Sequence, residues 1–162
     1  MRRGRCAAAA ALLLLAPRAS LGAQATDARL APELRVDALG GRGTSAQIGA
    51  GVQIPAGAYV RVGVIGAVGN RWLDGGYATE GRADVLARFL LDPFRQSRWG
   101  LSAGGGVSLL AHAGDRVRPN LLVALDLEGP RWSSGVSPAF SVGLGGGVRG
   151  GVALRWGRAR AR

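Results

Sequence analysis

The feature that most constrains this chain is a period of two in its hydropathy, which runs with few breaks from Glu33 to Trp156. Residues 46–54 read AQIGAGVQI, in which apolar residues alternate with small or polar ones, and the pattern resumes after Pro55-Ala56-Gly57. Alternation of this kind is typical of β-strands that have one apolar and one polar face. We therefore predict an all-β chain, and its function depends on which solvent meets the apolar face.

Turn-forming residues divide the alternating region into eight candidate strands. Most of these strands approach the roughly 9–11 residues that cross a bilayer at a tilt. The predicted turns and loops are 40–43, 55–57, 70–76, 92–93, 114–115, 129–130 and 145–147. No composition shift marks a domain boundary between them.

The first 25 residues have the organisation of a secretory signal peptide. Arg2, Arg3 and Arg5 precede an apolar core that is too short to span a bilayer, and Ala23-Gln24-Ala25 fits the small-x-small cleavage rule. Cleavage would lower the net charge from +11 to about +7 and would remove Cys6, the only cysteine. We predict a signal peptide over residues 1–25 and a barrel domain over 26–162, with strands within 33–156 and a basic tail over 157–162.

The charged residues of the predicted strands all share the phase opposite to the apolar one, and many of their neighbours in that phase are glycines. An eight-stranded barrel is just wide enough inside for side chains, so large arginines need small neighbours there. The predicted lumen charge network consists of Arg35, Asp37, Arg61, Glu80, Arg82, Asp84, Arg88, Asp126, Glu128, Arg149 and Arg155. This interpretation places the apolar phase in lipid. A soluble secreted ligand-binding β-barrel with an apolar core is the alternative, since it gives the same alternation.

Aromatic residues gather near the predicted strand ends. Phe94, Trp99, Trp132 and Trp156 fall at one end, and Trp72 with Tyr77 falls in the predicted loop at the other. Membrane barrels carry aromatic girdles at both interfaces, so we predict a girdle here. Tyr59 belongs to the first end but has the phase of the lumen.

On this pattern the chain resembles the small eight-stranded outer-membrane barrels of the OmpA/OmpX type, over about Glu33 to Trp156. The last strand is the most specific part, because Gly151, Leu154 and Trp156 are similar to the C-terminal assembly signal of that family. The resemblance implies an eight-stranded antiparallel up-and-down transmembrane β-barrel, located in the outer membrane and inserted by the barrel-assembly machinery. It also implies contact with outer-membrane lipids, and we expect a monomer.

Few residues are suited to catalysis. His112 is the only histidine, and it shares its phase with Ser108 and precedes Asp115. Four residues along a strand separate Ser108 from His112 by roughly 13 Å, which is too far for a serine hydrolase triad. With one histidine and no cysteine after cleavage, we expect no metal site and no cofactor.

The sequence therefore predicts a non-enzymatic outer-membrane protein with a structural or surface-interaction role. A lipid A hydrolase or acyltransferase that depends on His112 is the alternative from another class. Arg71, Arg116 and Arg118 lie in or beside predicted outer loops, and guanidinium groups bind phosphates bidentately. They are candidate contacts to lipopolysaccharide phosphates, although a solvated basic loop is the simpler interpretation. Export makes nucleic acid an unsuitable partner for the basic tail, whereas an anionic lipid head group fits.

Overall fold

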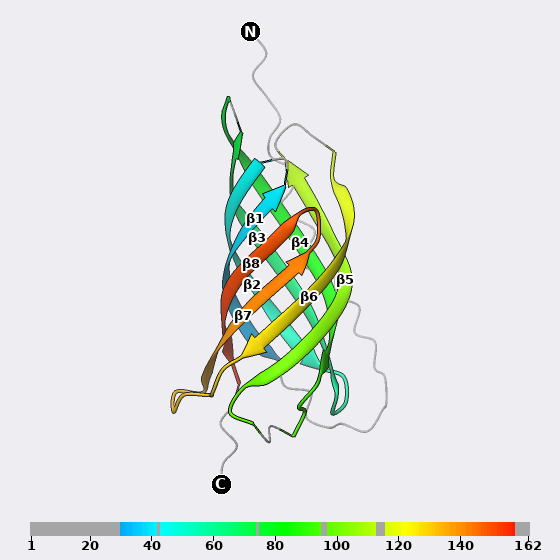
Figure 1. Ribbon diagram of the computed structural model, residues 1–162, viewed down its shortest axis with the longest axis vertical. Helices are drawn as coiled ribbons and strands as arrows, with labels where there is room; N and C mark the ends of the chain where they lie inside the picture. Colours follow the sequence, from blue (N-terminus) through cyan, green and yellow to red (C-terminus); the bar gives the residue numbers. More distant parts are fainter. Residues whose placement is uncertain (1–29, 42, 74, 95–96, 113–115, 158–162) are drawn as a thin grey trace.

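The computed structural model is a closed antiparallel β-barrel of eight strands (Figure 1). It describes residues 30–41, 43–73, 75–94, 97–112 and 116–157, so the predicted signal peptide, Asp115 and residues 158–162 of the predicted tail lie outside it. The strands are β1 (Ala31–Gly41), β2 (Gly43–Pro55), β3 (Val60–Leu73), β4 (Gly76–Leu90), β5 (Gly100–His112), β6 (Arg118–Glu128), β7 (Val136–Leu144) and β8 (Val148–Trp156). The predicted all-β, eight-stranded antiparallel fold is confirmed.

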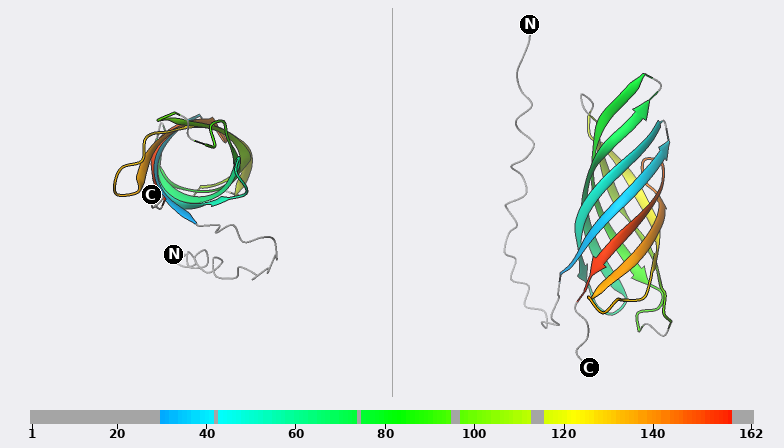
Figure 2. Two further views of the ribbon diagram at one scale, coloured as in Figure 1. Left: turned by 90° about the horizontal axis from the view of Figure 1, so that it is seen from below. Right: turned by 90° about the vertical axis from the view of Figure 1, so that its left-hand side faces the viewer.

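Each strand pairs with its neighbours in sequence, and β8 pairs with β1, which closes the ring seen along the barrel axis in Figure 2. β1 begins and β8 ends at one end of the barrel, which we call the termini end. The opposite end, the distal end, carries the β1–β2, β3–β4, β5–β6 and β7–β8 connections. In the described part of the chain, no helix is long and apolar enough to cross a membrane.

The β3–β4 hairpin extends further than predicted. Residues 70–76 were expected to form a loop, but β3 continues to Leu73 and β4 begins at Gly76. Trp72 pairs directly with Tyr77, so these two aromatics are strand residues and not loop residues. The prediction was wrong because Asn70 and Gly75-Gly76 favour turns, whereas the ladder keeps the backbone hydrogen-bonding groups paired almost to the tip.

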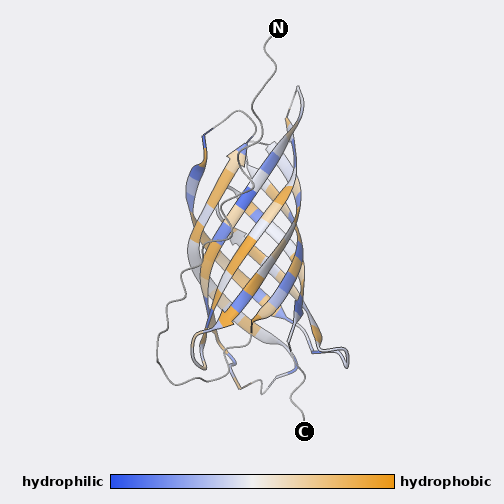
Figure 3. Ribbon diagram, turned by 180° about the vertical axis from the view of Figure 1, so that it is seen from behind, coloured by the Kyte–Doolittle hydropathy of each residue, from blue (hydrophilic) through white to orange (hydrophobic). Residues whose placement is uncertain are grey.

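Burial follows the predicted alternation, with the apolar phase outside and the charged phase inside. Figure 3 shows how hydrophobic and hydrophilic residues alternate along the strands. Val36, Val85 and Leu125 are about half exposed, at 51%, 53% and 50%. Asp37 and Asp84, by contrast, are 2% and 0% exposed. The valines therefore form the outer surface of this barrel and not its core.

Glycines on the inner face make room for the large side chains of the lumen. A Cβ atom added to Gly104 would lie 2.6 Å from the carbonyl oxygen of Ala87 and 3.0 Å from Cγ of Arg88. A Cβ atom added to Gly63 would lie 2.7 Å from Nη1 of Arg88. These approaches are too close for a side chain, so the absence of one at these positions allows Arg88 to lie inside the wall.

Apolar side chains also enter the lumen, which the sequence analysis did not predict. A buried cluster on the inner face of β3, β4 and β6 consists of Ile65, Leu86, Leu122 and Ala124. Leu39 and Leu110 are buried nearer the distal end. The interior is therefore a mixed core in which aliphatic side chains fill space between ion pairs.

Candidate functional site

Ion pairs in the middle of the lumen join strands that are not neighbours in the sheet. Arg82 of β4 pairs with Asp37 of β1, and Arg149 of β8 donates to Asp84 of β4 at 3.0 Å. Arg35 of β1 donates to Ser141 of β7 at 2.9 Å and also to Asp37 at 2.7 Å. Because the contacts of β4 with β1 and β8 cross the barrel, they brace opposite parts of its wall.

A second cluster lies toward the termini end and centres on Arg155. Its guanidinium donates to Asp126 at 2.7 Å and to Glu33 at 2.8 Å. Arg88 pairs with the same carboxylate of Asp126 at 2.5 Å, and Arg61 donates to Glu128 at 3.0 Å. Charged groups this deeply buried are tolerated only when they are paired in this way.

Every residue of the predicted charge network lies on the inner face of the wall, and all are buried except Arg61, whose side chain is 25% exposed. The sequence analysis missed Glu33, which is 2% exposed and also accepts a hydrogen bond from Gln53 at 2.5 Å. The signal was available, because Glu33 precedes Arg35 and Asp37 in the same phase. With Glu33 included, the acids and arginines of the network are equal in number.

The lumen opens at the distal end into a cavity of about 460 Å³, which we call the distal basin. Its polar lining comes from Ser45, Arg71, Glu80, His112, Arg118 and Asn120. At the termini end, a cavity of only about 20 Å³ lies beside Arg61 and Glu128. Of these two cavities in the described part of the chain, the larger is therefore at the distal end.

His112 ends β5 on the inner face, directly opposite Glu80 of β4. Its Nε2 lies 2.9 Å from Oε2 of Glu80 and 3.0 Å from Nη1 of Arg71. Ser45 donates its hydroxyl to Glu80 at 3.1 Å and not to His112. Among the described residues, Nδ1 of His112 has no hydrogen-bond partner. A nucleophile activated by histidine needs its hydroxyl on the imidazole, and this arrangement places a carboxylate and a guanidinium there instead.

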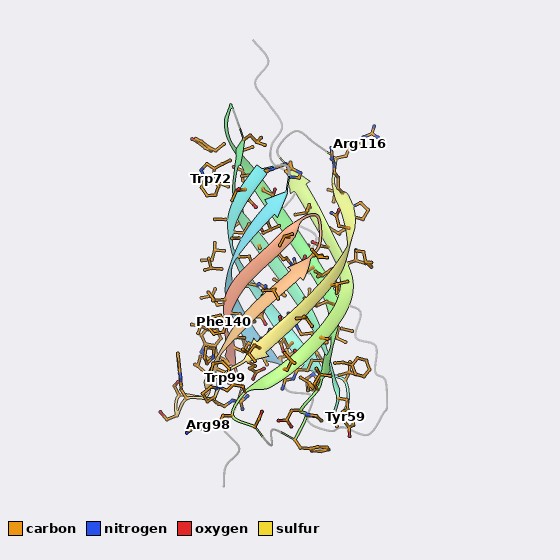
Figure 4. The ribbon with its side chains drawn as sticks, viewed as in Figure 1. Tyr59, Trp72, Arg98, Trp99, Arg116 and Phe140 are labelled. Atoms are coloured by element: carbon orange, nitrogen blue, oxygen red, sulfur yellow. The ribbon has the colours of Figure 1, made fainter. Side chains whose placement is uncertain are left out.

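The other predicted site residues divide between the two ends of the barrel (Figure 4). Phe94, Trp99, Trp132 and Trp156 are exposed toward the termini end. Tyr59 is also exposed there, in the β2–β3 turn, and packs edge-on against Phe94 with ring centroids 6.0 Å apart. At the distal end, Arg116 is exposed, whereas Arg71 points into the basin because the longer β3 keeps it in the inward phase.

The residues of the predicted assembly signal lie on both faces of β8. Gly151 faces the lumen beside Asp37, where a Cβ atom would overlap the carboxylate. Leu154 and Trp156 face outward, at 37% and 38% exposed. No family model and no curated protein matches this chain.

Proposed function

We propose that this protein is a non-enzymatic outer-membrane β-barrel whose lumen is filled by side chains and whose distal turns face the cell exterior. One observation carries the proposal, namely that the charged phase lies inside while the valines and leucines of the apolar phase form the outer surface. A soluble protein rarely exposes so continuous an apolar surface. In a bilayer the same surface meets acyl chains.

The lengths of the strands and the positions of the aromatics support this environment. β7 and β8 have 9 residues and β1 and β6 have 11, which suits tilted strands in a bilayer. Trp99 near one end and Trp72 near the other lie where the two interfaces of such a barrel would be. The predicted signal peptide accounts for export, and Gly151, Leu154 and Trp156 would serve recognition by the assembly machinery.

The role that fits this architecture is structural, or one of surface interaction through the distal end. We expect a monomer that contacts outer-membrane lipids through its outer surface and has Arg116 available for lipopolysaccharide phosphates. The filled lumen is expected to pass no solutes. Liposomes that contain the refolded protein should therefore swell in sugar solutions no faster than empty liposomes, and swelling at the rate of a general porin would contradict this.

The test of the membrane assignment is a gel-shift comparison of boiled and unboiled protein after refolding of the mature chain in detergent. A compact unboiled form whose mobility changes on boiling, and which does not form without detergent, is the expected result. Cooperative folding in plain buffer without such a shift would refute the proposal. It would instead indicate a soluble barrel with an unusually apolar surface.

A further inference from the structure

The outer face of the β3–β4 hairpin changes in character toward the distal end. Over 60–68 in β3 and 81–89 in β4, every residue in the outward phase is apolar or glycine. Each of these runs has the length of roughly 9–11 residues that crosses a bilayer at a tilt. Beyond them, Asn70 pairs with Thr79, and both residues are exposed. A polar row therefore ends the apolar surface on these two strands.

An aromatic pair lies one step further along the same strands. Trp72 pairs with Tyr77, and Thr44 of β2 pairs with Trp72 on its other side. Trp72 is 51% exposed and Tyr77 is 77% exposed, and Trp72 projects away from the wall (Figure 4). Two residues along a strand correspond to about 6–7 Å, so these aromatics lie beyond the polar row and not directly at the apolar surface. We call Thr44, Asn70, Trp72, Tyr77 and Thr79 the hairpin face.

The aromatics of the termini end have a different setting. Trp156 directly follows Leu154 in the outward phase of β8. Trp99 likewise stands two residues before Leu101, which also faces outward. These rings border the apolar surface directly, as the aromatics of an interfacial girdle do. The polar row therefore makes the hairpin face a different kind of surface from that girdle.

The hairpin also stands higher than the strand beside it. The β4–β5 ladder begins with Glu80 opposite His112, so residues 76–79 of β4 pair with β3 alone in the described register. Figure 2 shows this hairpin rising above the other strands of the distal end. In the membrane orientation proposed above, the hairpin face lies at the level of the lipid head groups and points sideways into the leaflet.

We propose that the hairpin face binds the sugar head group of a glycolipid in the surrounding outer leaflet. The inference rests on the proposed function, because it needs the barrel to lie in a membrane. The hydroxyl and amide groups of Thr44, Asn70 and Thr79 are donors and acceptors for sugar hydroxyls. The negative π faces of Trp72 and Tyr77 attract the C–H groups of a sugar ring, and each ring also carries a polar N–H or O–H group. All five side chains are uncharged, so the face suits a neutral saccharide better than a phosphate, which favours guanidinium partners.

The test is native mass spectrometry of the refolded mature chain in detergent micelles, titrated with digalactosyl diacylglycerol, a neutral glycolipid. Diacylglycerol with the same acyl chains lacks the sugar and is the first comparison. Phosphatidylcholine is the second, because aromatic side chains also bind quaternary ammonium groups. We expect saturable glycolipid binding that is about tenfold tighter than that of either comparison, since only the sugar uses both the polar and the aromatic row.

Two double variants test the two rows separately. Trp72→Val with Tyr77→Val removes the rings but keeps residues that favour strands. Asn70→Val with Thr79→Val removes the polar row and extends the apolar surface. Each should weaken glycolipid binding by about fivefold or more, because each removes half of the contacts to the sugar. The matched control is Trp99→Val, which removes a ring of the girdle and should bind as the wild type does.

Equal binding of the three lipids by the wild type would overturn the proposal, and so would undiminished glycolipid binding by the variant without the polar row. Preference for phosphatidylcholine would assign the face to a cationic head group, and a dimeric mass would assign it to a second copy of the chain. Either result would also overturn the proposal. Saturation-transfer NMR on the wild type, from aromatic ring protons to sugar protons, repeats the test if a variant fails to fold, and no transfer would refute the contact.

The boiled and unboiled gel comparison runs on the same samples and separates the two proposals. A barrel that needs detergent but shows no preference for the sugar would refute the glycolipid surface and leave the proposed function standing. A chain that folds without detergent would refute both.

Discussion

At the scale of single residues, this protein depends on how each buried charge is paired. Asp126 forms ion pairs with both Arg88 and Arg155, and no other ion pair is described for Arg88. Arg155, by contrast, also reaches Glu33 and Glu128. Loss of Asp126 therefore leaves Arg88 without a described ion pair, whereas Arg155 keeps two.

Replacement of Asp126 by Ala should lower the free energy of unfolding by about 3–5 kcal/mol, because it leaves Arg88 as an uncompensated buried charge. Asp92→Ala is the matched control. This acid lies in the β4–β5 connection and accepts hydrogen bonds from Ser97, so its loss should cost about 1 kcal/mol. Urea titration in micelles, followed by the unboiled gel form, measures both. Equal losses of unfolding free energy in the two variants would show that the buried ion pairs of Asp126 contribute no more to stability than the hydrogen bonds of Asp92.

Two adjacent glycines of β5 allow the space inside the wall to be tested directly. Gly104→Ala should destabilise the barrel by about 1–3 kcal/mol, since the new methyl group meets the carbonyl oxygen of Ala87. Gly105→Ala points outward, where a Cβ atom comes no closer than 3.6 Å to the oxygen of Leu122. That change should be neutral or stabilising by about 0.5 kcal/mol. The same urea titration applies, and a reversed order would place β5 with its other face inward.

The sequence predicted the direction of residues well where the alternation was unbroken, and less well where it met turn-forming residues. The inward positions of Arg35, Asp84 and Arg149 followed from phase alone. The inward position of Arg71 did not, because Asn70 and Gly75 indicated a loop. Contact between Glu80 and His112 was beyond the sequence, since it depends on the register between β4 and β5, which many weak cross-strand preferences set together.

At the scale of elements, the seam between β6 and β7 is the shortest part of the ladder. Its register joins Val123–Glu128 to Ala139–Leu144, whereas β5 pairs with β6 over the full length of β6. The eight strands and the turn at Gly145 to Gly147 were predictable from period and glycines. The unequal heights of the hairpins were not, because alternation reports which face a residue takes and not how far its neighbour extends.

Hydrogen exchange should reveal this seam. Residues 118–122 of β6 should exchange faster than residues 106–110 of β5, which lie opposite them but pair with strands on both sides. Exchange depends on how easily the backbone hydrogen bonds open, and those on the unpaired side are exposed to solvent. Mass spectrometry of peptides from the refolded protein measures the difference. Equal protection of the two segments would mean that another part of the chain covers this edge of β6.

At the scale of the whole molecule, the apolar outer surface and the filled lumen form an inverted arrangement relative to a soluble barrel. The stability of such a molecule should depend on its surroundings more than on its interior. The alternation by itself was compatible with either solvent, and the sequence favoured lipid only through the glycines and charges of the other phase. The structure shows that the apolar phase faces outward and the charged phase inward. Mutation of outward-facing residues can therefore test whether lipid or water surrounds the barrel.

A charge placed at mid-height on the outer surface gives that test. Val85→Arg should lower the free energy of unfolding in lipid vesicles by about 2–4 kcal/mol. Leu73→Arg, at the tip of the β3–β4 hairpin, should lower it by no more than about 1 kcal/mol. Both side chains are about half exposed, so a difference would report depth in the bilayer and not burial in the protein. Unfolding in vesicles is followed by tryptophan fluorescence. Small and equal effects would contradict a bilayer around the barrel.

The pairing of β8 with β1 has a consequence for where around the barrel the chain can begin and end. Glu33 stands opposite Arg155, so the two ends of the folded domain lie side by side at the termini end. A short linker between them would complete a cyclic order of strands in which every hairpin is equivalent in principle. New ends cut at the β3–β4 or β7–β8 turn would leave every ladder intact, because such surface turns tolerate circular permutation. The barrel is thus specified by the cyclic succession of its strands, and a permuted gene that begins at β4 would encode the same ring.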